Sequence, residues 1–278
     1  MSFSYQHRYH AGCFADVHKH LTLLAILQHL KQKPTPFCVL DTHAGEGLYD
    51  LNSAESQKTL ERSHGIDRLW QNVDVTPLVS QFFEQVKAYN VGKERRYYPG
   101  SAAIIVNLLR EQDRSLFVEK HPQAIAALRA FAASHKNQKI SIHERDANEA
   151  IKALVPFAEK RGLVFIDPSF EVKTEYETII QAMHNAYQRF SQGIYALWYP
   201  ILPEGYHETL LRHLKKTLIP KMWHCEWSPF PKQTTGMIGS GMVVINPPWQ
   251  LDTLLTHTFT TLNQTLFVGG QFKGVTLC

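Results

Sequence analysis

The sequence predicts an α/β fold in which helices cover both faces of a mostly parallel sheet. Short apolar runs alternate with segments whose apolar residues recur every three or four positions, and this alternation extends along most of the chain. Strands that alternate with helices in this way are typical of parallel sheets. The 278 residues allow one large domain, or one domain with an insertion. Hydrophobic residues make up 44% of the chain and charged residues 19%, which excludes an intrinsically disordered protein.

The first predicted helix begins near Asp16, which can cap it, and ends before Pro34 and Pro36. Its apolar positions lie on one face: Val17, Leu21, Leu24, Leu27 and Leu30. Residues 37–41 follow as a short apolar run that ends in an acid and is succeeded by glycines. This run is predicted to be a buried strand.

The later units follow the same pattern of strand and helix. Three predicted strands precede predicted helices at about 122–134, 147–160 and 174–190; these strands are residues 115–119, 140–143 and 162–167. Two further strands, at 193–199 and 242–246, each precede another helix. All of them are expected to join one mostly parallel sheet.

One interval along the chain is too long for a simple alternation. In sheets that bind nucleosides, an acid at the end of the second strand follows the glycine turn by about 20 residues. Here Glu61 stands near that distance but follows no strand, and the next strand-terminal acid is Glu119. We therefore predict an inserted, mainly helical subdomain at 49–99 between the core segments 1–48 and 100–278. One helical face of it would carry Val79, Phe82, Phe83 and Val86.

Acids at three strand ends indicate a nucleoside pocket. Asp41 begins a D-x-x-x-G-x-G turn whose Gly45 and Gly47 let the backbone approach a ligand closely. Glu119 could hold a ribose diol, and Asp146 could accept a hydrogen bond from an adenine amino group. Each feature alone has a simpler explanation, namely a tight turn, a solvated acid or a helix cap. Together, at the carboxyl ends of parallel strands, they favour a nucleoside cofactor.

The fourth strand ends in a segment suited to chemistry on an amino group. Asp167 and the Pro168 carbonyl can each accept one N–H, which aligns the nitrogen lone pair with an electrophilic methyl group, and Phe170 can stack on a base. A strand that simply ends at a proline is the structural alternative. The segment 246–249, Asn-Pro-Pro-Trp, matches the pattern [D/N]-P-P-[Y/F/W] better in its letters. Because it follows the last parallel-type strand, we interpret it as structural.

The chain resembles the bacterial 23S ribosomal RNA adenine-N6 methyltransferase family of the type called RlmJ. The resemblance extends over nearly the full length and is carried by Tyr5-x-His7-x-x-His10-Ala11-Gly12, Ala15-Asp16-Val17-x-Lys19-His20, Leu40-Asp41-Thr42-His43-Ala44-Gly45, Arg96-Tyr97-Tyr98-Pro99-Gly100-Ser101, Ile166-Asp167-Pro168, 193–200 and 241–249. It implies a class I, Rossmann-like fold that uses S-adenosylmethionine and has a helical subdomain inserted after the first core strand.

The resemblance also implies roles for single residues, namely a cofactor site at His20, His43, Ser101, Glu119 and Asp146, a catalytic Asp167 and a Tyr5 near the substrate. With the motifs above, the predicted cofactor-binding residues are Lys19, His20, Asp41, His43, Gly45, Gly47, Ser101, Glu119, Asp146 and Ala147. The predicted catalytic residues are Asp167, Pro168 and Phe170, and the predicted substrate-binding residues are Tyr5, His7, Arg95 and Arg96. The two arginines belong to a basic and aromatic cluster, for which a solvated charge run is the alternative.

Two features depart from the family pattern. The family has Asp-Pro-Pro-Tyr at the catalytic strand end, whereas this chain has Ser169 and Phe170 in the last two places. Phenylalanine can still stack, but serine frees the backbone torsion that a proline would fix. The family also has a basic pair before a Gly-Met segment, where this chain has Thr234 and Thr235, so fewer phosphate contacts are expected.

Charge and cysteine content add little about partners. The net charge of +4 identifies no partner. The four cysteines form no C-x-x-C pair, which indicates reduced thiols in a cytoplasmic protein, and no histidine or cysteine spacing typical of a metal site occurs, so no metal is expected. No apolar run approaches the roughly 18 residues of a membrane span, so neither a span nor a cleavable signal is expected.

We therefore expect a monomeric enzyme that uses S-adenosylmethionine to methylate the N6 amino group of an adenine in 23S ribosomal RNA. Two alternatives stay open. One is a methyltransferase that acts on DNA adenine or on a protein glutamine. The other is a non-catalytic RNA-binding or ribosome-assembly factor that retains the fold, against which Asp167 and the aromatic residue at position 170 speak.

Overall fold

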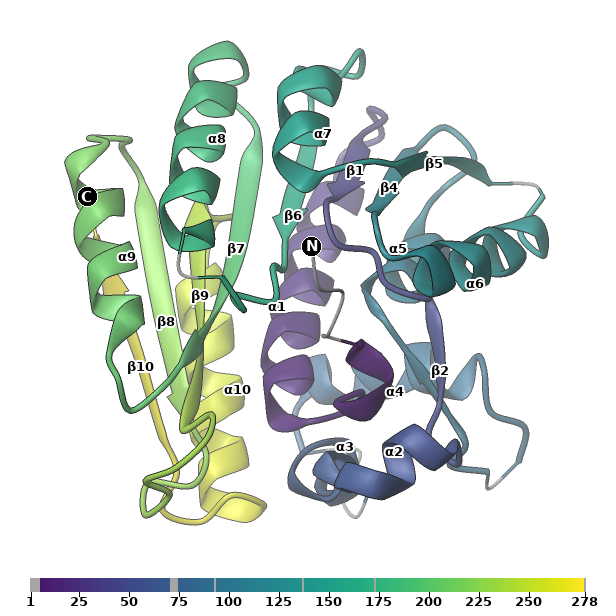
Figure 1. The fold of residues 1–278 in the computed structure, drawn as a ribbon, viewed down its shortest axis with the longest axis vertical. Coiled ribbons are helices and arrows are strands. Elements are labelled where there is room, and N and C mark those ends of the chain that lie inside the picture. Colours follow the sequence, from purple (N-terminus) through teal and green to yellow (C-terminus); the bar gives the residue numbers. More distant parts are fainter. Residues whose placement is uncertain (1–5, 71–74, 93, 137, 173, 278) are drawn as a thin grey trace.

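The computed structural model describes residues 6–70, 75–92, 94–136, 138–172 and 174–277. An eight-stranded sheet crosses the molecule (Figure 1) in the order β10 (Gln271–Thr276), β8 (Met222–Ser228), β9 (Gly239–Ile245), β7 (Ile194–Ile201), β6 (Gly162–Ile166), β1 (Cys38–Asp41), β4 (Arg114–Glu119) and β5 (Lys139–Glu144). The pairings from β5 to β7 are parallel, and those from β7 to β10 are antiparallel. The predicted α/β fold with a mostly parallel sheet is confirmed.

Helices cover both faces of this sheet (Figure 1). One face carries α1 (Phe14–Lys31), α5 (Ser101–Leu108) and α10 (Leu251–Thr265), and α1 packs against the other two. On the other face α8 (Glu175–Arg189) packs between α7 (Ala147–Leu154) and α9 (Tyr206–Lys216). At the β5 end of the sheet, α6 (Pro122–Ala133) packs against β5.

Two predicted helix boundaries are wrong. Cys13, and not Asp16, is the N-cap of α1; the Asp16 carboxylate instead accepts a hydrogen bond from the Gly12 N–H at 2.7 Å. The helix α7 ends at Leu154 rather than near residue 160, because Pro156 has no N–H to donate and restricts the residue before it.

The segment between residues 48 and 99 leaves the sheet and returns beside itself. It begins with β2 (Leu48–Asp50) and ends with β3 (Tyr97–Pro99), which pair in antiparallel orientation. Between them lie α2 (Ala54–Thr59), a 3₁₀ turn (Glu61–His64), α3 (Ile66–Leu69) and α4 (Pro77–Lys87). The buried face of α4, which includes Val79, Phe82, Phe83 and Val86, packs on α1. That residues 49–99 form a separate inserted subdomain stays a prediction.

The expectation that residues 242–246 form a parallel-type strand is wrong. The strand β9 is antiparallel to both β7 and β8. Only a short connection without a helix separates β8 from β9, and a parallel pair would need a crossover of a dozen or more residues. Asn246 therefore lies at the opposite edge of the sheet from Asp167. Its amide donates hydrogen bonds to the carbonyls of Ser191 and Gly193 at 2.8 Å each, which supports a structural role.

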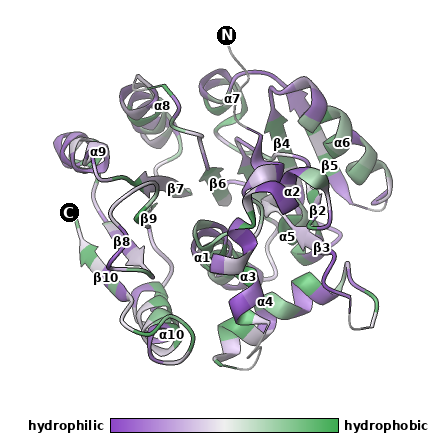
Figure 2. Ribbon diagram, turned by 60° about the horizontal axis from the view of Figure 1, so that its bottom comes forward, coloured by the Kyte–Doolittle hydropathy of each residue, from purple (hydrophilic) through white to green (hydrophobic). Residues whose placement is uncertain are grey.

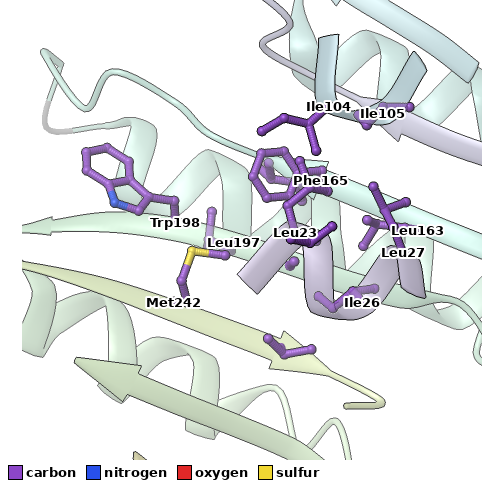
Figure 3. Packing of buried hydrophobic residues seen from close by; sticks show 14 of the residues in the cluster. Leu23, Ile26, Leu27, Ile104, Ile105, Leu163, Phe165, Leu197, Trp198 and Met242 are labelled. Atoms are coloured by element: carbon purple, nitrogen blue, oxygen red, sulfur yellow. The ribbon is translucent and has the colours of Figure 1, made fainter. Parts of the chain in front are cut away.

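The core lies between α1 and the centre of the sheet. Leu23, Ile26 and Leu27 of α1 pack towards Leu163 and Phe165 of β6, with Ile104 and Ile105 of α5 beside them (Figure 3). Figure 2 shows the same division by hydropathy, with hydrophobic residues along β4 and β6 and hydrophilic residues on α9. Among the described residues no helix has the length and apolar character needed to span a membrane.

Candidate functional site

A cavity of about 790 Å³ lies at the carboxyl edge of the parallel strands. Its volume falls in the range of about 300–1,000 Å³ that is typical of small-molecule and cofactor sites. It brings together most of the predicted site residues, which are His7, Lys19, His20, His43, Gly45, Ser101, Glu119, Asp146, Ala147, Asp167 and Pro168. Asp41, Gly47, Phe170, Arg95 and Arg96 do not line it. Tyr5 lies outside the described residues.

The turn after β1 is built around two glycines with positive φ, 61° at Gly45 and 84° at Gly47. A Cβ atom on Gly45 would stand 2.1 Å from the Tyr49 hydroxyl, and one on Gly47 would stand 2.9 Å from the Phe131 ring. Only glycine fits these two positions without a shift of the neighbours. The turn thus presents bare backbone to the cavity.

Glu119 is fixed to this turn by both carboxylate oxygens. Its Oε2 accepts a hydrogen bond from the Gly45 N–H at 2.9 Å. Its Oε1 accepts from the N–H groups of Lys120 and His121 at 2.8 and 2.7 Å. The carboxylate is therefore held at the cavity before any ligand binds, and the remaining lone pair of Oε2 can accept one further hydrogen bond.

Two other strand-end acids play different parts. Asp41 is completely buried beneath the turn and accepts a hydrogen bond from the His43 N–H at 3.2 Å. Burial raises the pKa of Asp41 to about 7, against the opposing effect of the Ser101 hydroxyl. Asp146 lines the cavity and also caps α7, since it accepts from the Asn148 N–H at 2.9 Å. Asp41 thus lies beneath the cavity and stabilises the turn, whereas Asp146 lies at the cavity surface.

A chain of charges leads from the N-terminal segment to Asp167. The ammonium of Lys19 lies 2.6 Å from Asp167 Oδ2 and 2.9 Å from Asp16 Oδ1. It also lies 5.3 Å from the centroid of the Trp198 ring. Burial opposes ionisation of Asp16, but His7, at 3.0 Å, and Lys19 hold the pKa of that carboxyl well below its usual value. Lys19, which is predicted to bind the cofactor, thus forms an ion pair with the predicted catalytic residue Asp167.

Two histidines of the site have lowered pKa values. Burial lowers the pKa of His20 to about 3, and its Nδ1 lies 2.8 Å from the Tyr98 hydroxyl. Burial also lowers the pKa of His43, although Asp167 and Glu119 act in the opposite direction. Within the described parts of the chain, no group of three or more His, Cys, Asp or Glu side chains is placed to hold a metal ion.

Phe170 faces away from the cavity. Its ring is buried against Tyr176, with 4.2 Å between the ring centroids, and its φ is 53°. For Phe170 to stack on a base in the cavity, the backbone after Pro168 would have to change conformation so that the ring leaves Tyr176.

The two predicted RNA-binding arginines lie at the end of the segment 51–96, which connects β2 to β3. The Arg95 guanidinium lies 5.7 Å from the Trp70 ring centroid. Arg96 pairs with Asp50 at 2.8 Å and lies over the Tyr97 ring at 5.0 Å. Both side chains therefore have protein partners outside the cavity.

Among the cavity-lining residues that sequence reasoning missed are Arg8, Glu46 and Trp198. The Arg8 guanidinium pairs with Glu46 at 2.9 Å and with Glu55 at 3.3 Å. It therefore joins the N-terminal segment to both the glycine turn and α2. Trp198 lies within the apolar run of β7, where its position gave no signal. All three depend on contacts between distant segments, which no local pattern indicates.

Comparison with known proteins places these features in a family. A model of the family described as "Ribosomal RNA large subunit methyltransferase D, RlmJ" matches residues 34–274. "Ribosomal RNA large subunit methyltransferase J" of Haemophilus influenzae is 41% identical over 269 residues, which is 96% of this chain and 95% of that protein. The protein of the same description from Escherichia coli is 38% identical over 268 residues, again 96% of this chain and 95% of that protein.

A solved structure agrees with the sequence comparison. The crystal structure of protein LPL1258 from Legionella pneumophila has a TM-score of 0.89 to this structure at 35% identity, and the match covers 96% of this chain and 98% of that chain. The chain is thus a methyltransferase with the class I fold. It belongs to the RlmJ family of ribosomal RNA large subunit methyltransferases, which confirms the resemblance found in its sequence.

Proposed function

We propose that this chain transfers a methyl group from S-adenosylmethionine to the N6 amino group of an adenine in 23S ribosomal RNA. The observation that carries the proposal is the position of Asp167-Pro168, which line the same cavity as the glycine turn and Glu119. A nucleoside held by the turn and an amino group held by Asp167 would therefore meet within one space.

The residues present fit S-adenosylmethionine. Gly45 lines the cavity with bare backbone, and a side chain at this position would collide with Tyr49. Glu119 is oriented by three backbone N–H groups and would accept a hydrogen bond from a ribose hydroxyl, and Asp146 would accept from the adenine amino group. When bound, the cofactor supplies an electrophilic methyl group on a sulfonium, so the protein needs to supply only alignment and charge stabilisation.

Asp167 and Pro168 would orient the target nitrogen. Lys19 holds Asp167 Oδ2 at 2.6 Å, which leaves Oδ1 to accept one N–H of the adenine. The Pro168 carbonyl would accept the other N–H, so that the nitrogen lone pair points at the methyl group. The carboxylate also stabilises the positive charge that develops on the nitrogen as the new C–N bond forms. An adenine in a helix must first leave its stack, at a cost of a few kcal/mol.

Ribosomal RNA is the favoured substrate because the relatives are described as ribosomal RNA methyltransferases. Arg95 and Arg96 would contact RNA phosphates near the segment that connects β2 to β3. Such a reaction would take place in the cytoplasm. The test compares methyl transfer from S-adenosylmethionine to a 23S RNA fragment, a DNA of the same sequence and a glutamine peptide, with the product identified by mass spectrometry. We expect N6-methyladenosine in the RNA. Methylation of the DNA or the peptide alone, or of nothing, would contradict the proposal.

A further inference from the structure

A buried hydroxyl joins the wall of the cavity to the core of the protein. Ser240 on β9 lies between two side chains that are distant in the sequence, Trp198 on β7 and His18 on α1. Its Oγ is 2.9 Å from Trp198 Nε1 and 2.9 Å from His18 Nδ1. Ser240 and His18 are fully buried, whereas Trp198 reaches the cavity.

One hydrogen-bond direction follows from the chemistry of the groups. An indole N–H can only donate, so Ser240 Oγ accepts from Trp198. The Ser240 hydroxyl also forms a hydrogen bond with His18 Nδ1, in which the donor depends on the imidazole tautomer, and His18 Nε2 lies 3.4 Å from Cys225 Sγ. Burial lowers the pKa of His18 to about 3, so the imidazole is neutral at physiological pH.

Trp198 connects this chain of bonds to the reacting end of the cavity. Its ring lies 5.3 Å from the Lys19 ammonium, and that ammonium lies 2.6 Å from Asp167 Oδ2. Figure 3 shows Trp198 at one end of the packed core, beside Leu197 and Met242. The hydrogen bond that Trp198 Nε1 donates to Ser240 Oγ restricts rotation of the indole plane at this end. Without it, the indole N–H would be left without a partner and the ring could change orientation.

We propose that Ser240, supported by His18, is a positioning residue for methyl transfer, because it holds the indole of Trp198 in the orientation that directs Lys19 onto Asp167. This inference rests on the proposed function, since it acts through Asp167. Ser240 does not line the cavity and no sequence motif marks it. Because the Trp198 ring lies beside the Lys19 ammonium that pairs with Asp167, the effect should fall on the transfer step and leave cofactor binding intact.

The activity test is a double-mutant cycle with Ser240→Ala and Trp198→Phe. We expect Ser240→Ala to lower kcat for RNA methylation about tenfold while the Kd of S-adenosylmethionine changes less than about twofold. Phenylalanine has no N–H, so in the Trp198→Phe background Ser240→Ala should change kcat less than about twofold. Ser240→Cys keeps the volume but is a poor acceptor, and the same expectations apply to it if the alanine variant does not fold.

Thr258→Val is the matched control. The Thr258 hydroxyl is also buried but has no hydrogen-bond partner among the described residues, so its removal should leave kcat unchanged. An unchanged kcat in Ser240→Ala, an equal loss in both backgrounds, or a loss equal to that of Thr258→Val would each overturn the proposal.

A second measurement does not depend on activity. The five tryptophans give five indole N–H signals in an ¹H–¹⁵N NMR spectrum, and Trp198→Phe identifies the one that belongs to Trp198. We expect this signal to exchange slowly with solvent in the wild type and to shift and exchange faster in Ser240→Ala. A signal unaffected by Ser240→Ala would overturn the inference. If the wild type fails to methylate RNA, the proposed function fails, while this spectrum still decides whether Ser240 holds Trp198.

Discussion

Replacement of Glu119 tests how the proposed cofactor is held. Three backbone N–H groups fix its carboxylate at the cavity, at distances of 2.7 to 2.9 Å. If its free lone pair on Oε2 accepts a hydrogen bond from a ribose hydroxyl, Glu119→Ala removes one hydrogen bond to a charged group, which contributes about 1.5–3 kcal/mol. Since about 1.4 kcal/mol corresponds to a factor of ten, the Kd of S-adenosylmethionine should rise about 10- to 150-fold.

Isothermal titration measures this Kd, and thermal melting of each variant shows whether the fold is intact. Glu119→Gln is the matched control of equal size. Its amide must direct an NH₂ group either at the Gly45 N–H or at the N–H groups of Lys120 and His121, so it should bind more weakly than the wild type while keeping one acceptor. A folded Glu119→Ala variant with the wild-type Kd would refute the placement of the ribose at Glu119.

Further predictions concern the metal, pH, salt and the second Pro-containing motif. S-adenosylmethionine should bind equally well in a chelator, and titration that shows binding only with a divalent ion would contradict the site described above. Because the pKa of Asp41 is raised to about 7 in the folded state, its contribution to the free energy of unfolding should fall as pH rises from about 4 to 7. Denaturant titrations should show that Asp41→Asn removes this fall, and an identical pH dependence in both proteins would contradict the pKa. Arg95→Ala should reduce the slope of log affinity for RNA against log salt by roughly one unit, whereas an unaltered slope would leave Arg95 as ordinary surface. Asn246→Ala loses two hydrogen bonds and should lower the free energy of unfolding by about 1–3 kcal/mol without a matching loss of kcat, and a kcat loss in a folded variant would assign the chemistry to the wrong motif.

The strand ends of the site could be predicted because local sequence determines them. Asp41, Glu119 and Asp167 each end or directly follow a short apolar run, and parallel strands place such ends at one edge of the sheet. The glycines of the turn are equally local signals. Most of the cavity residues could therefore be predicted without knowledge of their contacts.

Other features depend on contacts that the sequence does not express locally. The strand β8 carries His224 and Glu226 and has no continuous apolar run, so it escaped notice, and the antiparallel direction of β9 depends on it. The orientation of Phe170 depends on its positive φ and on Tyr176. The pairing of Lys19 with Asp167 joins residues from α1 and from the end of β6, which only the tertiary fold brings together.

The most direct test of the central claim is methyl transfer to a 23S RNA fragment by the wild type and by Asp167→Ala, with the product nucleoside identified by mass spectrometry. We expect N6-methyladenosine from the wild type. If Asp167 aligns the amino group, the variant should bind S-adenosylmethionine nearly as well as the wild type, yet its kcat should fall roughly 10²-fold or more, which is comparable to the loss of one preorganised polar contact in a transition state. Full activity in a folded Asp167→Ala variant would contradict the account.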